Sequence, residues 1–218
     1  MRSDLAKSKE ILCKITRFYL SFCKIRPLKR IMKIIGLAGT NGAGKDTLGE
    51  ILAKYHGFIF ITVSDFLREE AKKRGLKPER EPLRQISAEW RRKKGLGVLV
   101  DMAVDEFKKT GKKFNGLVVG SLRNSGEAEA VKKAGGIMVW VDADPKIRYQ
   151  RVASRQRDKE SQMAYEEFLK DEKVEMQHRG DEATLSLSKV KAQADIFIEN
   201  NSTLDDFRQK IEKALGLA

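Results

Sequence analysis

The stretch Gly39-Thr-Asn-Gly-Ala-Gly44-Lys45-Asp46-Thr47 decides the fold of this chain. It follows a short apolar run, 33–38, and opens a helical pattern that begins near Asp46. Glycines let backbone N–H groups turn inward around an anion, and the start of the helix adds its positive dipole end. A lysine at this place bridges the β- and γ-phosphates of a nucleotide. The sequence therefore predicts a loop that binds the phosphates of ATP or GTP. The predicted nucleotide-binding residues of the loop are Gly39, Thr40, Asn41, Gly42, Ala43, Gly44, Lys45, Asp46 and Thr47.

One position of this loop departs from the usual pattern. The residue after the lysine is usually a Ser or Thr that ligates Mg²⁺, whereas here it is Asp46, with Thr47 one place later. Thr47 can supply the hydroxyl, or Asp46 can hold a water bound to the metal. We expect Mg²⁺ at these two residues, and the sequence leaves both interpretations open.

Strands and helices alternate from Met32 onward. Short apolar runs predict strands at 33–38, 58–63, 117–119, 137–141 and 196–198. Helical patterns lie at 46–55, 64–73, 79–93, 98–109, 126–134, 145–155, 165–176 and 204–215. Alternation of this kind with buried strands predicts an α/β fold, a five-stranded parallel sheet between two layers of helices. Ligands of such sheets bind at the carboxyl ends of the strands.

Composition excludes several classes of protein. The chain has 218 residues, of which 41% are hydrophobic and 34% charged, and this balance describes a globular chain rather than a disordered or collagenous one. It contains no run of about 18 apolar residues that would span a bilayer. Cys13 and Cys23, with His56 and His178, are too few for a disulfide framework or a structural zinc cluster. We therefore expect a cytoplasmic protein without an integral membrane segment.

Residues 1–31 differ from the rest of the chain. They hold nine Lys or Arg residues against Asp4 and Glu10, so more than half of the net charge of +13 lies in this segment. Apolar residues recur there at helical spacing, namely Ile11, Leu12, Ile15, Phe18, Tyr19 and Phe22. The pattern predicts a basic amphipathic extension. It fits a helix on an anionic membrane surface or partner, an accessory helix packed on the body, or an upstream extension of the reading frame before Met32.

From Met32 onward the chain resembles P-loop nucleotide kinases, a group that includes adenylate kinase, dephospho-CoA kinase and deoxynucleoside monophosphate kinases, and especially archaeal kinase-like proteins of this type. The resemblance implies a P-loop NTPase fold for residues 32–218, with acceptor-binding helices at about 64–110 and an arginine-rich lid at about 151–165. In the stretch 63–71 the resemblance implies that Arg68 binds the acceptor phosphate. It also implies that Asp65 takes the place of the acidic catalytic residue of dephospho-CoA kinases.

The resemblance extends to the third strand, Leu117-Val-Val-Gly-Ser-Leu-Arg123-Asn. Relatives carry apolar residues, then Asp-Gly, then an arginine that takes the acceptor phosphate, and Arg123 keeps that place. Gly120 stands where relatives have the strand-end aspartate, so the carboxylate that supports Mg²⁺ must come from elsewhere, with Asp65 and Asp46 as candidates.

After the fourth strand, the stretch 142–158 resembles the entry to a kinase lid. Arg151 and Arg155 are four residues apart on one helix face, so they can present two guanidinium groups to the transferring phosphoryl group. Arg148 and Arg157 are expected on a solvated face instead. Asn200, in the turn after the last strand, is expected near the adenine.

The run between Arg80 and Lys94 lies where these kinases insert acceptor-binding helices. We expect Gln85 to bind a base edge there. A phosphate is expected at Arg84, Arg91 or Arg92, and Trp90 is assigned to the core.

These residues predict a kinase that moves the γ-phosphoryl group of Mg·ATP to a small nucleotide-like acceptor. A nucleoside or deoxynucleoside monophosphate is the first choice and dephospho-CoA the second. Lys45, Asp65, Arg123, Arg151 and Arg155 are the predicted catalytic residues, and Arg68 and Gln85 bind the acceptor. An alternative of another class is a P-loop ATPase that acts as an RNA- or ribosome-associated switch, which the basic N-terminus and Gly120 favour; nucleic acid is therefore a possible but not a favoured partner. The oligomeric state is left open.

Overall fold

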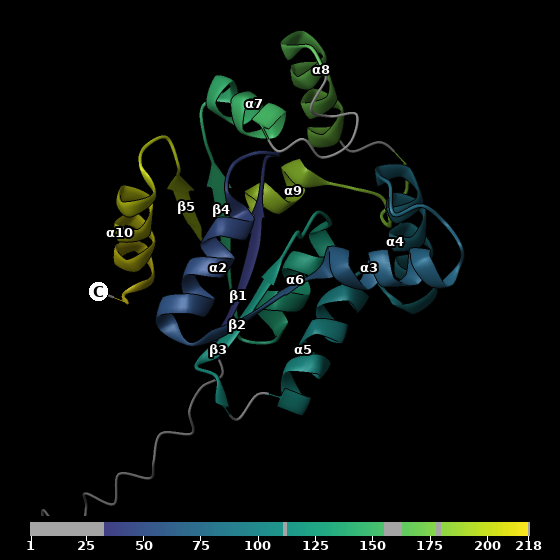
Figure 1. Ribbon diagram of the computed structural model, residues 1–218. Helices are drawn as coiled ribbons and strands as arrows, with labels where there is room; N and C mark the ends of the chain where they lie inside the picture. The colour runs from purple at the N-terminus through teal and green to yellow at the C-terminus, as the bar shows by residue number, and fades with distance from the viewer. Residues whose placement is uncertain (1–32, 111–112, 155–162, 178–179, 218) are drawn as a thin grey trace, which may run out of the picture. The chain divides into compact units, whose positions relative to one another are not determined.

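The computed structural model describes residues 33–110, 113–154, 163–177 and 180–217, which form a parallel sheet between helices (Figure 1). The strands are β1 (Lys33–Gly39), β2 (Phe58–Thr62), β3 (Gly116–Gly120), β4 (Ile137–Asp142) and β5 (Ile196–Glu199). Their order is β2-β3-β1-β4-β5, and every neighbouring pair is parallel. The predicted three-layer α/β/α sandwich of a P-loop NTPase is confirmed. The strand that leads into the phosphate loop lies at the centre of the sheet.

Both faces of the sheet are buried because consecutive residues of a strand point to opposite sides. In β1, Ile34 and Ala38 pack into one apolar cluster, whereas Ile35 and Leu37 pack into the other. All five residues of β3 are buried, which explains why the strands have continuous apolar sequences rather than an alternating pattern.

Two sets of helices cover the two faces. The first set is α2 (Lys45–His56) and α10 (Leu204–Leu215). The second set is α3 (Val63–Lys73), α5 (Val98–Thr110), α6 (Ser125–Lys133) and α9 (Leu187–Ala192). Each helix turns an apolar stripe to the sheet, as Leu48 and Leu52 of α2 and Phe207 and Ile211 of α10 show.

Three further helices lie at the carboxyl edge of the sheet or beside it (Figure 1). They are α4 (Arg80–Lys94), α7 (Pro145–Ser154) and α8 (Tyr165–Met176). Helix α4 packs on α3 and α5. Helices α7 and α8 contact each other through aromatic rings. The ring centroid of Tyr149 lies 5.3 Å from that of Tyr165 and 5.7 Å from that of Phe168. These helices build the walls of the site described below.

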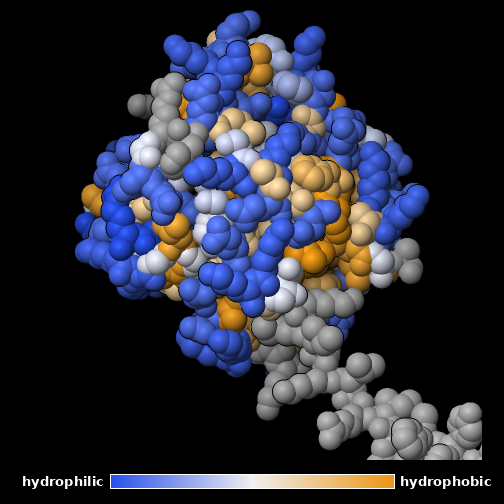
Figure 2. Space-filling view, turned by 180° about the vertical axis from the view of Figure 1, so that it is seen from behind, coloured by the Kyte–Doolittle hydropathy of each residue, from blue (hydrophilic) through white to orange (hydrophobic). Residues whose placement is uncertain are grey.

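The sequence pattern missed one element. Helix α9 has six residues, of which only Leu187 and Val190 are buried, so its apolar stripe is too short to stand out. None of the helices in the described part of the chain is long and apolar enough to cross a membrane. Figure 2 shows a face on which hydrophilic residues predominate between apolar patches. The predictions for residues 1–31 lie outside the described residues.

Candidate functional site

The phosphate loop connects β1 to α2 at the carboxyl edge of the sheet. Gly44 is the N-cap of α2 with φ +96°, and a Cβ at this position would overlap the Asn200 side-chain nitrogen. Only glycine fits such a conformation at such close approach. Because glycine brings no capping side chain, the first N–H groups of α2 face the loop, where an anion can satisfy them. The Lys45 Nζ donates to the Thr40 carbonyl at 2.6 Å, so its charge lies over the loop.

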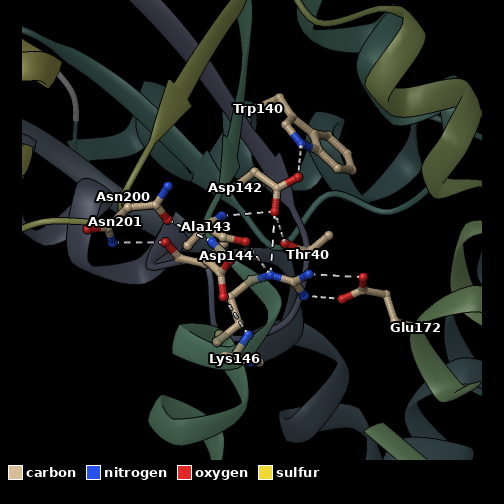
Figure 3. A network of polar contacts seen from close by, with 12 residues as sticks. Thr40, Trp140, Asp142, Ala143, Asp144, Lys146, Glu172, Asn200 and Asn201 are labelled. Carbon is tan, nitrogen blue, oxygen red and sulfur yellow. Dashed lines mark hydrogen bonds and ion pairs between the residues drawn. The ribbon is translucent and has the colours of Figure 1, made fainter. Parts of the chain in front are cut away.

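Asp142, the last residue of β4, anchors this loop to the sheet (Figure 3). Its Oδ1 accepts hydrogen bonds from the Thr40 hydroxyl at 2.7 Å and from the Ala143 N–H at 2.9 Å. Its Oδ2 accepts a longer bond from Trp140 Nε1 at 3.4 Å. The carboxylate therefore fixes the second residue of the phosphate loop from the neighbouring strand.

Arg148 of α7 is buried, which corrects the expectation of a solvated position. Its side chain is only 3% exposed and pairs with the carboxylate of Glu172 on α8. The Nε donates to the Ala143 carbonyl at 2.8 Å and lies 3.5 Å from Asp142 Oδ1. The guanidinium also lies over the Phe168 ring. One cation thus ties the two helices above the sheet to the strand edge that holds the loop.

The turn after β5 closes the loop from the other side. Asn200 Nδ2 donates to the Ala43 carbonyl at 2.9 Å, and the Asn200 N–H donates to the Asp142 carbonyl at 2.8 Å. Arg151 donates to the Asn200 carbonyl at 3.0 Å, and another of its nitrogens lies 3.5 Å from the Gly42 carbonyl. Asn200 and Arg151 therefore both lie against the backbone of the phosphate loop.

The end of β3 lacks a carboxylate for a packing reason. A Cβ at Gly120 would lie 2.7 Å from a ring carbon of Phe60, and a Cβ at Gly49 would lie 2.5 Å from the same ring. Phe60 of β2 thus occupies the space between two glycines, and an aspartate at 120 does not fit beside it. Ser121, the next residue, has φ +65°, a strained value for a residue with a side chain.

A cavity of about 240 Å³ opens beside the loop. Asn41 of the loop lines it, and five cations line it as well: Arg68, Arg80, Arg84, Arg91 and Arg123. Its apolar lining residues are Val63, Leu67, Pro78, Leu83, Val152 and Leu185. Arginines offer planar, multiple N–H donors that match phosphate and carboxylate groups. The cavity is therefore suited to a small molecule that carries an anionic group.

Two carboxylates balance these arginines. Glu175 of α8 pairs with Arg80, Arg84 and Arg123. Burial alone would raise the pKa of Glu175, but the positive charges of these three arginines hold that pKa below its ordinary value. Glu127 of α6, fully buried, accepts two hydrogen bonds from Arg91. The cavity wall is therefore charged, paired and largely preorganised before any ligand binds.

The chain resembles one protein family and several curated proteins in sequence. A family model described as AAA domain matches residues 35–179, two thirds of the chain. A UPF0200 protein of Sulfurisphaera tokodaii is 31% identical over 190 residues, which cover 85% of this chain and 97% of the relative. The chain belongs to the AAA domain and UPF0200 families. Another relative, the UPF0200/UPF0201 protein of Archaeoglobus fulgidus, is 28% identical, and the match spans 55% of its length.

Solved structures share the fold of this UPF0200 chain. The shikimate kinase of Bacteroides thetaiotaomicron has a TM-score of 0.52 at 15% identity, covering 85% of this chain and 99% of that one. The shikimate kinase of Acinetobacter baumannii, solved with shikimate, has a TM-score of 0.51 at 23% identity, covering 86% and 95%. The structural similarity shows a shared fold, and identities this low show nothing about the reaction or the substrate.

The predicted acceptor residues of the UPF0200 chain lie at different places. Arg68 and Arg123 both line the cavity. Asp65 lies at the start of α3, where it accepts from Arg68 at 2.8 Å and from the Thr62 hydroxyl at 2.7 Å. Gln85 is exposed, bonds to another side chain of α4 and does not line the cavity. Arg155 lies outside the described residues.

The magnesium prediction rests on the first turn of α2. Asp46 is exposed and Thr47 half-buried there, directly after Lys45, and both offer the oxygen atoms that Mg²⁺ prefers. Across the described residues no group of three or more His, Cys, Asp or Glu side chains is placed to hold a metal. The donor set fits an ion that takes most of its ligands from nucleotide phosphates and water.

Sequence reasoning missed three residues of this site: Arg80, Asp142 and Glu175. A helical stripe could have revealed Arg80, because Arg80, Arg84, Ser87 and Arg91 share one face of α4 and all line the cavity. Glu175 lies seven residues after Phe168, so both share the buried face of α8. An acidic residue on a buried face indicates a charged partner nearby.

Proposed function

We propose that this UPF0200 chain is an ATP-dependent kinase that moves the γ-phosphoryl group of Mg·ATP to a nucleoside or deoxynucleoside monophosphate. One observation carries the proposal: a phosphate loop and an arginine-lined cavity adjoin at the carboxyl edge of the sheet, and Asn41 belongs to both. Donor and acceptor phosphates bound at these two places would lie next to each other, as an in-line transfer requires.

Positioning and charge neutralisation would supply the catalysis. Lys45 and the loop N–H groups hold the donor phosphates, and Asn200, bonded to the loop at Ala43, would lie near the adenine. Arg68 and Arg123 bind the acceptor phosphate in the cavity. An acceptor oxygen forms the new bond to the γ-phosphorus, and the bond between that phosphorus and the bridging oxygen breaks to leave ADP.

The remaining predicted residues have supporting roles in this proposal. Asp65 orients Arg68, and Arg151, with Arg155, would close over the transferring group. Gln85 would bind an acceptor base only after it leaves its present hydrogen bond to Glu81, because it does not line the cavity. Mg²⁺ at Asp46 and Thr47 would neutralise the phosphate charge.

Dephospho-CoA is the second proposed acceptor, because its diphosphate also offers anionic oxygens to the arginines. Its accepting atom is a hydroxyl oxygen, whose proton Asp65 would take. The test is ADP formation from Mg·ATP with a panel of nucleoside monophosphates, deoxynucleoside monophosphates and dephospho-CoA. One acceptor should stimulate ADP formation and appear as its phosphorylated product only when Lys45 is intact. If ATP binds but no acceptor raises turnover above background, the kinase proposal fails, and binding of labelled RNA is the next measurement.

A further inference from the structure

Three arginines from two parts of the fold meet on one oxygen atom. Arg80 and Arg84 lie one turn apart on α4, and each places a nitrogen 2.9 Å from Glu175 Oε1. Arg123, in the turn after β3, places a nitrogen 3.1 Å from the same oxygen. Three guanidinium groups repel one another unless an anion lies between them, so the carboxylate holds the group together.

The carboxylate lies behind the arginines rather than in the cavity. The Glu175 side chain is 6% exposed and is not among the cavity's lining residues, whereas the three arginines line it and are each about a third exposed. Within the described residues, Arg84 Nε is buried and has no hydrogen-bond partner. A buried donor without a partner is costly, so the contacts of the other Arg84 nitrogens with carboxylates must offset this cost.

The charge of the cluster selects a class of ligand. The three guanidinium groups and Glu175, the one buried carboxylate among their partners, leave two positive charges. Asp171 and Glu81 lie farther away, 3.9 Å from Arg80 and Arg84, and are largely exposed, so water screens them. A phosphate monoester carries nearly two negative charges at neutral pH, and its three oxygens can accept from several arginines at once. A single carboxylate ligand would neutralise only half of this charge.

We propose that Glu175 is a positioning residue that assembles Arg80, Arg84 and Arg123 into one binding site for a phosphate dianion. This inference rests on the proposed function, since it concerns the acceptor side of the same site. Glu175 does not touch the ligand. It sets the direction of the three guanidinium groups, and it links them to α8.

The test measures binding of inorganic phosphate by isothermal titration calorimetry, in full-length proteins that all carry Lys45→Ala to weaken binding at the phosphate loop. Glu175→Gln should weaken phosphate binding about tenfold, because the arginines lose their common orientation. Glu175→Asp keeps the charge and should lose less. Glu167→Gln, an exposed change on the same helix, should bind as the reference does. A further variant with both Arg84→Gln and Arg123→Gln should show how much phosphate binding remains without the cluster.

Phosphate binding that is unchanged or tighter in Glu175→Gln overturns the inference, and so does binding that does not depend on Arg84 and Arg123. If Glu175→Gln fails to fold, Glu175→Asp decides, because shortening the side chain by one methylene must still weaken binding. None of these measurements needs turnover, so they stand apart from the acceptor panel. Once the acceptor is known, Glu175→Gln should raise the KM for the acceptor and leave the KM for ATP unchanged. A purely structural role of Glu175 would not separate the two KM values in this way.

Discussion

The phosphate loop and the arginine cavity share one edge of the sheet, but they hold their polar groups in different ways. The loop is fixed by hydrogen bonds to its backbone, among them those that Lys45 and Asn200 donate to its carbonyls. The cavity is fixed by charge, since four of its five arginines are paired with Glu175 or Glu127. Side chains far apart in the sequence hold both places, but they bind neutral backbone and hydroxyl groups at the loop and opposite charges at the cavity.

This difference predicts how each side responds to change. A substitution in the loop should affect the proposed donor alone, because Asp142 and Asn200, which anchor the loop, are not among the residues that line the cavity. A substitution among the arginines should affect the acceptor and also spread through the shared carboxylate, since groups in one network are not additive.

The largest expected effect is on the donor side. Lys45→Ala should lower kcat/KM for ATP by about 1,000-fold, because it removes the cation that stabilises the transferring phosphates. Lys54→Ala, an exposed change at the other end of the same helix, should keep wild-type rates. Steady-state kinetics with the acceptor found in the panel decide this, and equal rates for the two variants would remove the loop from the mechanism.

Arg123→Gln should act on the acceptor side with a smaller effect. We expect the acceptor KM to rise about 30-fold, because one of several charge-assisted hydrogen bonds is lost, with the KM for ATP nearly unchanged. Arg92→Gln is the matched control, since Arg92 pairs with Asp181 outside the cavity. A rise in the KM for ATP instead of the acceptor would contradict the division into two sides.

Arg148→Met tests the contact that joins the two sides. Glu172 and Asp142 would lose their buried cation, and because both are partly exposed we expect a loss of about 2 kcal/mol in the free energy of unfolding. Lys146→Met, exposed on the same helix, should change stability little. Urea unfolding measures both, and equal stabilities would show that Arg148 is not a structural tie.

The smallest effect concerns pH. The pKa of Glu175 is lowered in the folded state, so its contribution to stability is fully present above its ordinary pKa of 4.5 and is lost as the pH falls below that value. Glu175→Gln lacks this group. The wild type should be the more stable protein at pH 7, and the gap should narrow at pH 3.5 in urea unfolding. A gap that stays constant or widens would show that the arginines do not stabilise the charged form.

Sequence was a good guide where the information is local. The nine residues of the loop are contiguous, so their spacing alone predicted the turn and the helix that follows it, while the anion stays a prediction. The strands were predicted because burial on both faces makes them continuously apolar. The roles assigned to Lys45, Asp65, Arg68 and Arg123 stay predictions.

Sequence failed where charge is paired at a distance. Arg148 has the pattern of a solvated helix face, and nothing nearby shows that Glu172 covers it from the next helix. The same holds for Glu175, whose three partners lie 52 or more residues away. Helical spacing can place Arg80 or Glu175 on a buried face, but it does not name the partner, because each charged residue alone is typical of a surface.

The Phe60 ring, which lies between Gly49 and Gly120, also limits which residues positions 60 and 120 can carry together. An aspartate at 120 would clash with Phe60, and a smaller residue at 60 would leave a void between two glycines. Each single step lowers stability, and only the two together restore packing. Positions 60 and 120 are thus energetically coupled, and a double-mutant cycle of these two positions should give an interaction energy well away from zero.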